Sequence, residues 1–166
     1  VPGGPVCRPG NPGEIDYGTV AAGVGLVNLP GDRMGVTVGC SSRGHKQLRQ
    51  RPDGSINWAT WKKGRLAALE APEEGNFRTF HLIIPQRRAY LNFKTAVGGR
   101  VEVQVCDSRY NPIPGRSYED CDWLVGDEID RELTWKGESD LGHEGDGPIS
   151  LSFRMRSAEL YSIEFR

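Results

Sequence analysis

The segment that most constrains the fold is residues 89–107, where apolar and polar residues alternate on both sides of the Gly98-Gly99 pair. Leucine and phenylalanine take alternate positions in 91–93, and three valines do so in 101–105. A period of two with one apolar face indicates a half-buried β-strand. Consecutive glycines allow the positive φ angles of a tight reversal. The segment therefore predicts a β-hairpin that lies on a hydrophobic core.

The rest of the chain predicts further strands. Its 166 residues include 22 Gly and 11 Pro between short apolar runs, which favours an all-β protein. Alternating runs predict about eight to ten short strands with little or no helix, among them 34–40 and 55–61. Residues 157–159 are expected to turn the chain between two strands. The expected fold is a two-sheet antiparallel β-sandwich, of the jelly-roll or concanavalin-like kind, over residues 14–166, preceded by a linker or extended arm at 1–13.

Charge and hydropathy exclude two partner classes at this stage. The formal net charge is −1, so the chain lacks the basic footprint expected of a protein that binds nucleic acid or an anionic membrane. No apolar run approaches the roughly 20 residues of a membrane-spanning helix. The chain begins at Val1 without a visible secretory signal, so we expect a processed or excised piece of a longer protein.

The cysteines leave two interpretations open. None of the four has the C-x-x-C spacing of a zinc or redox site. An even count is compatible with disulfides, and a bridge between Cys106 and Cys121 would close the loop between them. The alternative is that the thiols are small buried apolar groups.

Acidic residues cluster between 119 and 128 in a segment rich in turn residues. Two of these carboxylates could form the acid/base pair of a glycosidase. They could instead bind calcium together with backbone carbonyl groups. The third interpretation is a solvated acidic loop without chemistry of its own.

The aromatic residues suggest a different chemistry. A flat ring suits the apolar face of a sugar, and nearby polar groups suit its hydroxyls. The alternative is that these rings cover sheet edges and the rim of the core. The candidate carbohydrate-binding residues are Trp123, Tyr110, Trp61, Glu119 and Asp120.

Several segments together resemble one known kind of domain. They are NPIPG (111–115), LTWKG (133–137) and ISLSFRMRSAELYSIEF (149–165). This pattern resembles the C-terminal β-sandwich that follows a five-bladed propeller in invertase/fructanase-like glycoside hydrolases. The resemblance covers roughly residues 58–166. Upstream, EIDYG (14–18) and RPDGSINWATW (51–61) are similar to the end of the last propeller blade and the crossover into the sandwich.

The resemblance implies an accessory role. Residues 14–54 would be the remnant of a propeller blade, and the catalytic carboxylates of such enzymes lie on earlier blades, so no catalytic residue is carried over. Related sandwiches act as carbohydrate-binding modules. We therefore expect a secreted, non-catalytic module whose partners are a polysaccharide or oligosaccharide and a propeller catalytic domain of the same parent protein. No cofactor is expected, with calcium left open. The alternatives are a glycoside hydrolase that uses carboxylates of residues 119–128, and a purely structural domain that packs on a catalytic propeller.

Overall fold

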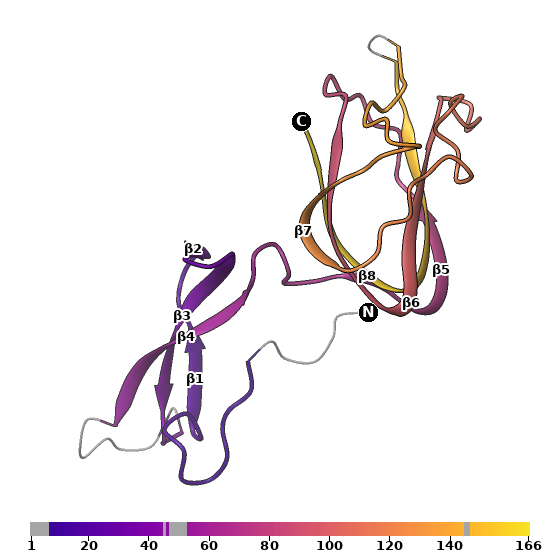
Figure 1. Ribbon diagram of the computed structural model, residues 1–166. Helices are drawn as coiled ribbons and strands as arrows, with labels where there is room; N and C mark the ends of the chain where they lie inside the picture. Colours follow the sequence, from indigo (N-terminus) through magenta and orange to yellow (C-terminus); the bar gives the residue numbers. More distant parts are fainter. Residues whose placement is uncertain (1–6, 45, 47–52, 145–146) are drawn as a thin grey trace. The chain divides into compact units, whose positions relative to one another are not determined.

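The computed structural model describes residues 7–44, 46, 53–144 and 147–166. Within these ranges eight strands occur and no helix, so none of them holds a helix able to cross a membrane. The chain divides into two compact units, residues 1–63 and 64–166, where the sequence predicted one sandwich over 14–166. Each unit has its own antiparallel sheet (Figure 1). The predicted all-β class with two antiparallel sheets is confirmed.

The sheet of the first unit is built around β3 (Arg33–Ser41). The strand β4 (Gly54–Lys62) pairs with the whole length of β3 along one edge. The short strands β1 (Thr19–Ala22) and β2 (Val27–Leu29) share its other edge, one beside each half of β3. The strands predicted at 34–40 and 55–61 are confirmed. Residues 45 and 47–52, within the expected blade remnant, lie outside the described residues.

The two faces of this sheet differ in burial. One face carries Val38 and Cys40, which are buried. On the other face Ile56 and Trp58 of β4 are exposed, and Ile56 stands across the strand pair from Gly39. Because glycine leaves no side chain beside Ile56, this face of the first unit is open and apolar.

The second unit holds a sheet of four antiparallel strands in the order β5-β8-β6-β7. Its two central strands are long, β6 (Ala89–Cys106) and β8 (Ser150–Phe165). Its edge strands are β5 (Leu69–Arg78) and β7 (Asp127–Glu132). The strand β5 pairs with residues 152–160 of β8, and β7 pairs with residues 90–94 of β6. Each central strand therefore has neighbours on both sides.

The hairpin predicted at 89–107 is wrong, because β6 runs continuously through the two glycines. It pairs with β8 from Ala89 to Thr95 and again from Arg100 to Cys106. Both halves of β6 therefore already have a hydrogen-bonding partner, and the glycines bend the strand instead of reversing it. Figure 1 shows β6 and β8 curving together, so that two arms of one sheet face each other.

The turn predicted at 157–159 is wrong for the same reason. The strand β8 continues through Ser157, which has a left-handed φ of 42°. A Cβ added to Gly99 would lie 2.5 Å from the carbonyl oxygen of Ser157. The two bends therefore press against each other, and only glycine fits at position 99.

The core of the second unit lies between the two arms. Alternate residues of β6 and β8 point into it, and loop residues close its open side. Complete burial of a large apolar side chain stabilises a fold by about 1.5–3 kcal/mol. The indole N–H of Trp135 donates to the carbonyl oxygen of Val103 at 2.9 Å, so the largest core side chain leaves no polar atom unpaired. The largest fully buried side chains are Trp135, Phe93, Phe153, Leu91, Leu133, Leu141 and Leu151.

Candidate functional site

The polar side of one arm forms the candidate site. Residues 151, 153 and 155 of β8 are buried in the core, so the alternating residues 152, 154 and 156 point away from it. The cross-strand register aligns them with residues of β5 and β6 in three rows. We call this surface the outer face. Its rows are Glu74–Arg156–Arg100, Asn76–Arg154–Glu102 and Arg78–Ser152–Gln104.

Three aromatic rings from the loop 107–126 lie against guanidinium groups of this face. Each ring meets an arginine of a different strand, one each from β5, β6 and β8. Cation–π contacts at exposed sites contribute about 0.5–1 kcal/mol each, enough to orient a ring. The pairs are Trp123 with Arg100 at 4.4 Å, Tyr118 with Arg154 at 3.9 Å, and Tyr110 with Arg78 at 4.7 Å.

A tight turn presents Tyr110. The carboxylate of Asp107 accepts hydrogen bonds from the backbone N–H groups of Arg109 at 2.8 Å and Asn111 at 2.9 Å. The bond from Asn111 is the main reason that the pKa of Asp107 is lowered. These bonds hold Tyr110 in a left-handed conformation with φ 67°, and its ring stacks on His81 at 4.6 Å.

A second turn positions Tyr118. The carboxylate of Asp120 accepts a hydrogen bond from Ser117 Oγ at 2.7 Å and forms an ion pair with Lys136. The hydrogen bond from Lys136 and that from Ser117 lower the pKa of Asp120 to about 2. Asp120 therefore fixes the turn that carries Tyr118, and its negative charge is balanced by Lys136 within the protein.

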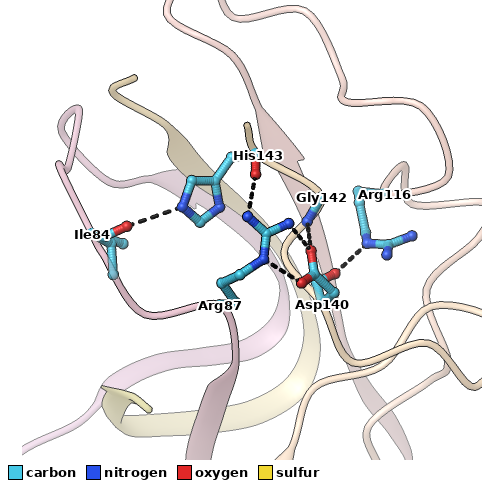
Figure 2. Close-up of polar contacts among 6 residues, drawn as sticks. All are labelled: Ile84, Arg87, Arg116, Asp140, Gly142 and His143. Carbon is cyan, nitrogen blue, oxygen red and sulfur yellow. Dashed lines mark hydrogen bonds and ion pairs between the residues drawn. The ribbon is translucent and has the colours of Figure 1, made fainter. Parts of the chain in front are cut away.

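A polar cluster anchors the base of the loop (Figure 2). The guanidinium of Arg87 binds both carboxylate oxygens of Asp140, at 2.5 and 2.8 Å, and donates to the carbonyl oxygen of His143 at 2.7 Å. The Arg116 Nε donates to the carbonyl oxygen of Asp140. The His143 Nε2 lies 3.0 Å from the carbonyl oxygen of Ile84. Three loops of the second unit are thereby joined, which limits how far the loop 107–126 can move.

The outer face is hollowed between its rows. A hollow of about 340 Å³ is lined mainly by charged and polar side chains of β5, β6 and β8. Ligand pockets typically have roughly 300–1,000 Å³. Within it, Arg100 pairs with Glu102 at 2.9 Å, and Arg156 lies 3.9 Å from Glu74. The polar lining suits a ligand with many hydroxyl or charged groups better than an apolar one.

A second hollow of about 460 Å³ adjoins the first at the bend of β6. Arg100 lines both, and Trp123 and Val125 form one wall of the second. Trp123 is 60% exposed although Arg100 lies against its ring. An extended ligand could therefore run from the charged rows to an exposed indole.

The structure places the predicted site residues unequally. Trp123 and Tyr110 both flank the outer face, as a shared site requires. Glu119 is exposed in the turn that carries Tyr118. It lies next to Asp120, whose carboxylate already binds Ser117 and Lys136. Trp61 lies on β4 of the first unit, half-buried and paired with Met34, so it belongs to a different sheet.

The sequence reasoning missed four members of the site. Alternation in 150–156 already placed Arg154 on the polar side of its strand. It could not show which strands would lie beside Arg154, and these supply its neighbours. The missed members are Tyr118, Arg78, Arg100 and Arg154.

Carboxylates of the acidic loop differ from a glycosidase acid in the direction of their pKa shifts. A glycosidase acid needs a raised pKa to hold its proton near neutral pH. The pKa values of Glu119 and Asp122 are instead lowered, first by a backbone hydrogen bond and by the hydroxyl of Thr134 respectively. Among the described residues, no group of three or more His, Cys, Asp or Glu side chains could hold a metal ion.

The thiols of Cys106 and Cys121 are both buried and do not form the disulfide that the sequence left open. The Cys121 sulfur accepts a hydrogen bond from the Val103 N–H at 3.2 Å, and burial raises the pKa of the Cys121 thiol to about 11.

No family model matches the chain, and neither a curated protein nor a solved structure matches it significantly.

Proposed function

We propose that the chain is a non-catalytic carbohydrate-binding module and that the outer face of the second unit binds the sugar. The observation that carries this proposal is the set of three aromatic rings from one loop, each held against an arginine of a different strand. Sugars combine an apolar ring face with an edge of hydroxyl groups. Rings beside Asn76, Glu102 and Gln104 offer partners for both.

The rings are oriented before any ligand arrives. Trp123 and Tyr110 are exposed, yet each is held by a guanidinium and by a turn with fixed hydrogen bonds or backbone pairing. Leu124, next to Trp123, exchanges backbone hydrogen bonds with Val101 of β6 at 2.9 and 3.0 Å. Pre-organised side chains lose less conformational entropy on binding, which favours affinity. A secreted protein with this face would meet polysaccharides outside the cell.

A second candidate function is structural, and it is supported by the first unit. Its open face carries Ile56 at 80% and Trp58 at 52% exposure. Exposed apolar surface of this kind marks an interaction site. A sheet of a propeller in the same parent protein is the partner that the resemblance suggests. This role and sugar binding use different units, so both could hold.

Affinity electrophoresis through gels that contain inulin, levan, xylan or pectin tests the leading proposal. Trp123→Ala is expected to lose several-fold in affinity for the retained polymer, since it removes the most exposed ring of the site. Trp58→Ala, a matched loss of an exposed indole in the first unit, should bind as the parent does. Failure of every polysaccharide to retard the protein would overturn the proposal.

A further inference from the structure

We propose that the glycan bound by the outer face is anionic, and that Arg78 and Arg154 bind the carboxylates of a uronic acid polymer. This inference rests on the proposed function and adds the charge of the ligand to it. It comes from the balance of charge on the outer face, which the near-neutral total of the chain conceals.

The four arginines of the outer face are not equally neutralised. Arg100 has Glu102 at 2.9 Å and Arg156 has Glu74 at 3.9 Å. No described carboxylate lies within ion-pair distance of Arg78 or Arg154, although Glu119 is close enough for Arg154 to help lower its pKa. Two guanidinium groups are therefore available to a ligand anion.

The positions of these two arginines suit one acidic polymer. Arg78 is paired with Ser152, and Arg154 lies two residues further along β8. Diagonal neighbours of this kind are about 7–8 Å apart in an antiparallel pair. Arg78 Nε donates to Ser152 Oγ at 2.7 Å, which fixes the guanidinium and leaves its terminal nitrogens free to donate. Arginine presents a planar fork of donors that matches a carboxylate.

The aromatic partners favour a sugar acid over a simple anion. Tyr110 lies against Arg78 and Tyr118 against Arg154, so each cation has a ring beside it. Asn76, which is paired with Arg154 and lies two residues before Arg78 on β5, adds an amide that can bind hydroxyls. Carboxylate, ring face and hydroxyl occur together on each residue of a polyuronate.

The test compares two polymers with the same backbone. Polygalacturonate and fully methyl-esterified homogalacturonan differ in whether each carboxyl group is a charged carboxylate or a neutral methyl ester, and binding of the whole chain to each is measured by titration calorimetry. We expect polygalacturonate to bind at least about 10-fold more tightly, the effect of one charge-assisted hydrogen bond. Raising the salt from about 0.05 M to about 0.5 M should weaken this binding because exposed charges are screened.

Single substitutions locate the contact. Arg78→Gln and Arg154→Gln should each weaken polygalacturonate binding by about 10-fold. Each should weaken binding of the neutral ester less, because the ester loses only the support that the guanidinium gives to its neighbouring ring. Arg88→Gln is the control, because it removes the same charge from a 58%-exposed side chain just before the start of β6, away from the outer face. This variant should bind as the parent does. Thermal unfolding of each variant checks that the fold is retained.

The outcomes separate the two proposals. Equal or tighter binding of the neutral ester overturns the anionic assignment and leaves sugar binding in place. Binding of neither polymer, together with no retardation by any of the polysaccharides named above, overturns both. Binding of a single-stranded DNA oligomer with no binding of polygalacturonate would assign the arginines to nucleic acid and also overturn the inference.

Discussion

Both units of this protein are built from antiparallel strands, but they differ in how far their apolar side chains are buried. In the second unit, the sheet bends on itself and encloses a core that includes Phe93, Phe153 and Trp135. In the first unit, Val38 and Cys40 are the buried apolar side chains among the described residues, and one face stays open. A sheet becomes self-sufficient when something covers its apolar face. In the second unit, that cover is the other arm of the same sheet.

The comparison also separates two kinds of exposed aromatic. Trp58 lies on a flat apolar face without an arginine against it among the described contacts. Trp123 lies against Arg100, a residue that lines the polar hollow, and itself lines the second hollow. The same residue type is thus suited to packing in one unit and to binding a polar ligand in the other.

The largest expected difference between the units concerns stability. Phe93→Ala should lower the free energy of unfolding by about 3–5 kcal/mol, because it leaves a cavity in a closed core. Trp58→Ala should change it by about 0.5 kcal/mol or less, because its indole is 52% exposed. Urea denaturation of the whole chain measures both. A comparable loss for Trp58→Ala would show that the open face is covered in solution.

The bend that closes the second unit can be tested at its two glycines. Gly99→Ala should destabilise by about 1–3 kcal/mol, because the new Cβ would press on the carbonyl oxygens of Arg156 and Ser157. Gly98→Ala meets no neighbouring atom and should cost about 1 kcal/mol for its left-handed φ of 77°. Denaturation midpoints compare the pair. A larger loss at Gly98 would mean that backbone strain, not contact between the bends, limits this site.

A smaller effect should appear in the acid stability of the second unit. Its folded state holds the pKa of Asp120 at about 2, below the ordinary 3.8, so the ionised form stabilises the fold above pH about 4. That contribution is lost as the pH falls towards about 2. Asp120→Asn should therefore lower the melting temperature at neutral pH, and the difference from the parent should shrink at pH about 2.

Melting curves of both proteins across this pH range provide the measurement. Lys136→Met removes the partner of Asp120 and should reproduce the neutral-pH loss. A difference between Asp120→Asn and the parent that stays constant with pH would show that the carboxylate acts by shape and not by charge.

The smallest predicted difference is kinetic. Cys40 of the first unit and Cys121 of the second are 8% and 7% exposed. We expect iodoacetamide to alkylate Cys40 faster, because a sheet with an open face unfolds locally at lower cost than a closed core. Cys7 is exposed and serves as the fast reference. Mass spectrometry of timed samples gives the three rates. Equal protection of Cys40 and Cys121 would contradict the contrast between the units.

The errors of the sequence reasoning follow from the same contrast. Alternation in 89–107 correctly predicted strand and inward face, since both are local properties. The hairpin was predicted from the glycine pair, but such a pair is equally compatible with a reversal and with a bend in a continuous strand. Only the presence of β8 along both halves of β6 decides between them, and β8 lies far away in sequence.

The site divides in the same manner. Exposed aromatics in a turn-rich loop pointed to Trp123 and Tyr110, and both flank the outer face. Their arginine partners come from three strands whose order depends on the fold of the whole unit. Trp61 was grouped with them by residue type, although its strand belongs to the other sheet.

The central position of β8 has a consequence for the order in which the protein is made. A ribosome releases β5, β6 and β7 before β8, yet among the described strands β8 is the one partner of β5, and β6 pairs with β8 along both arms. Until β8 emerges, the apolar sides of the three earlier strands have no complete sheet to join. The second unit therefore acquires its core only after β8 has left the ribosome, and the three earlier strands are most exposed to aggregation and chaperones just before that point.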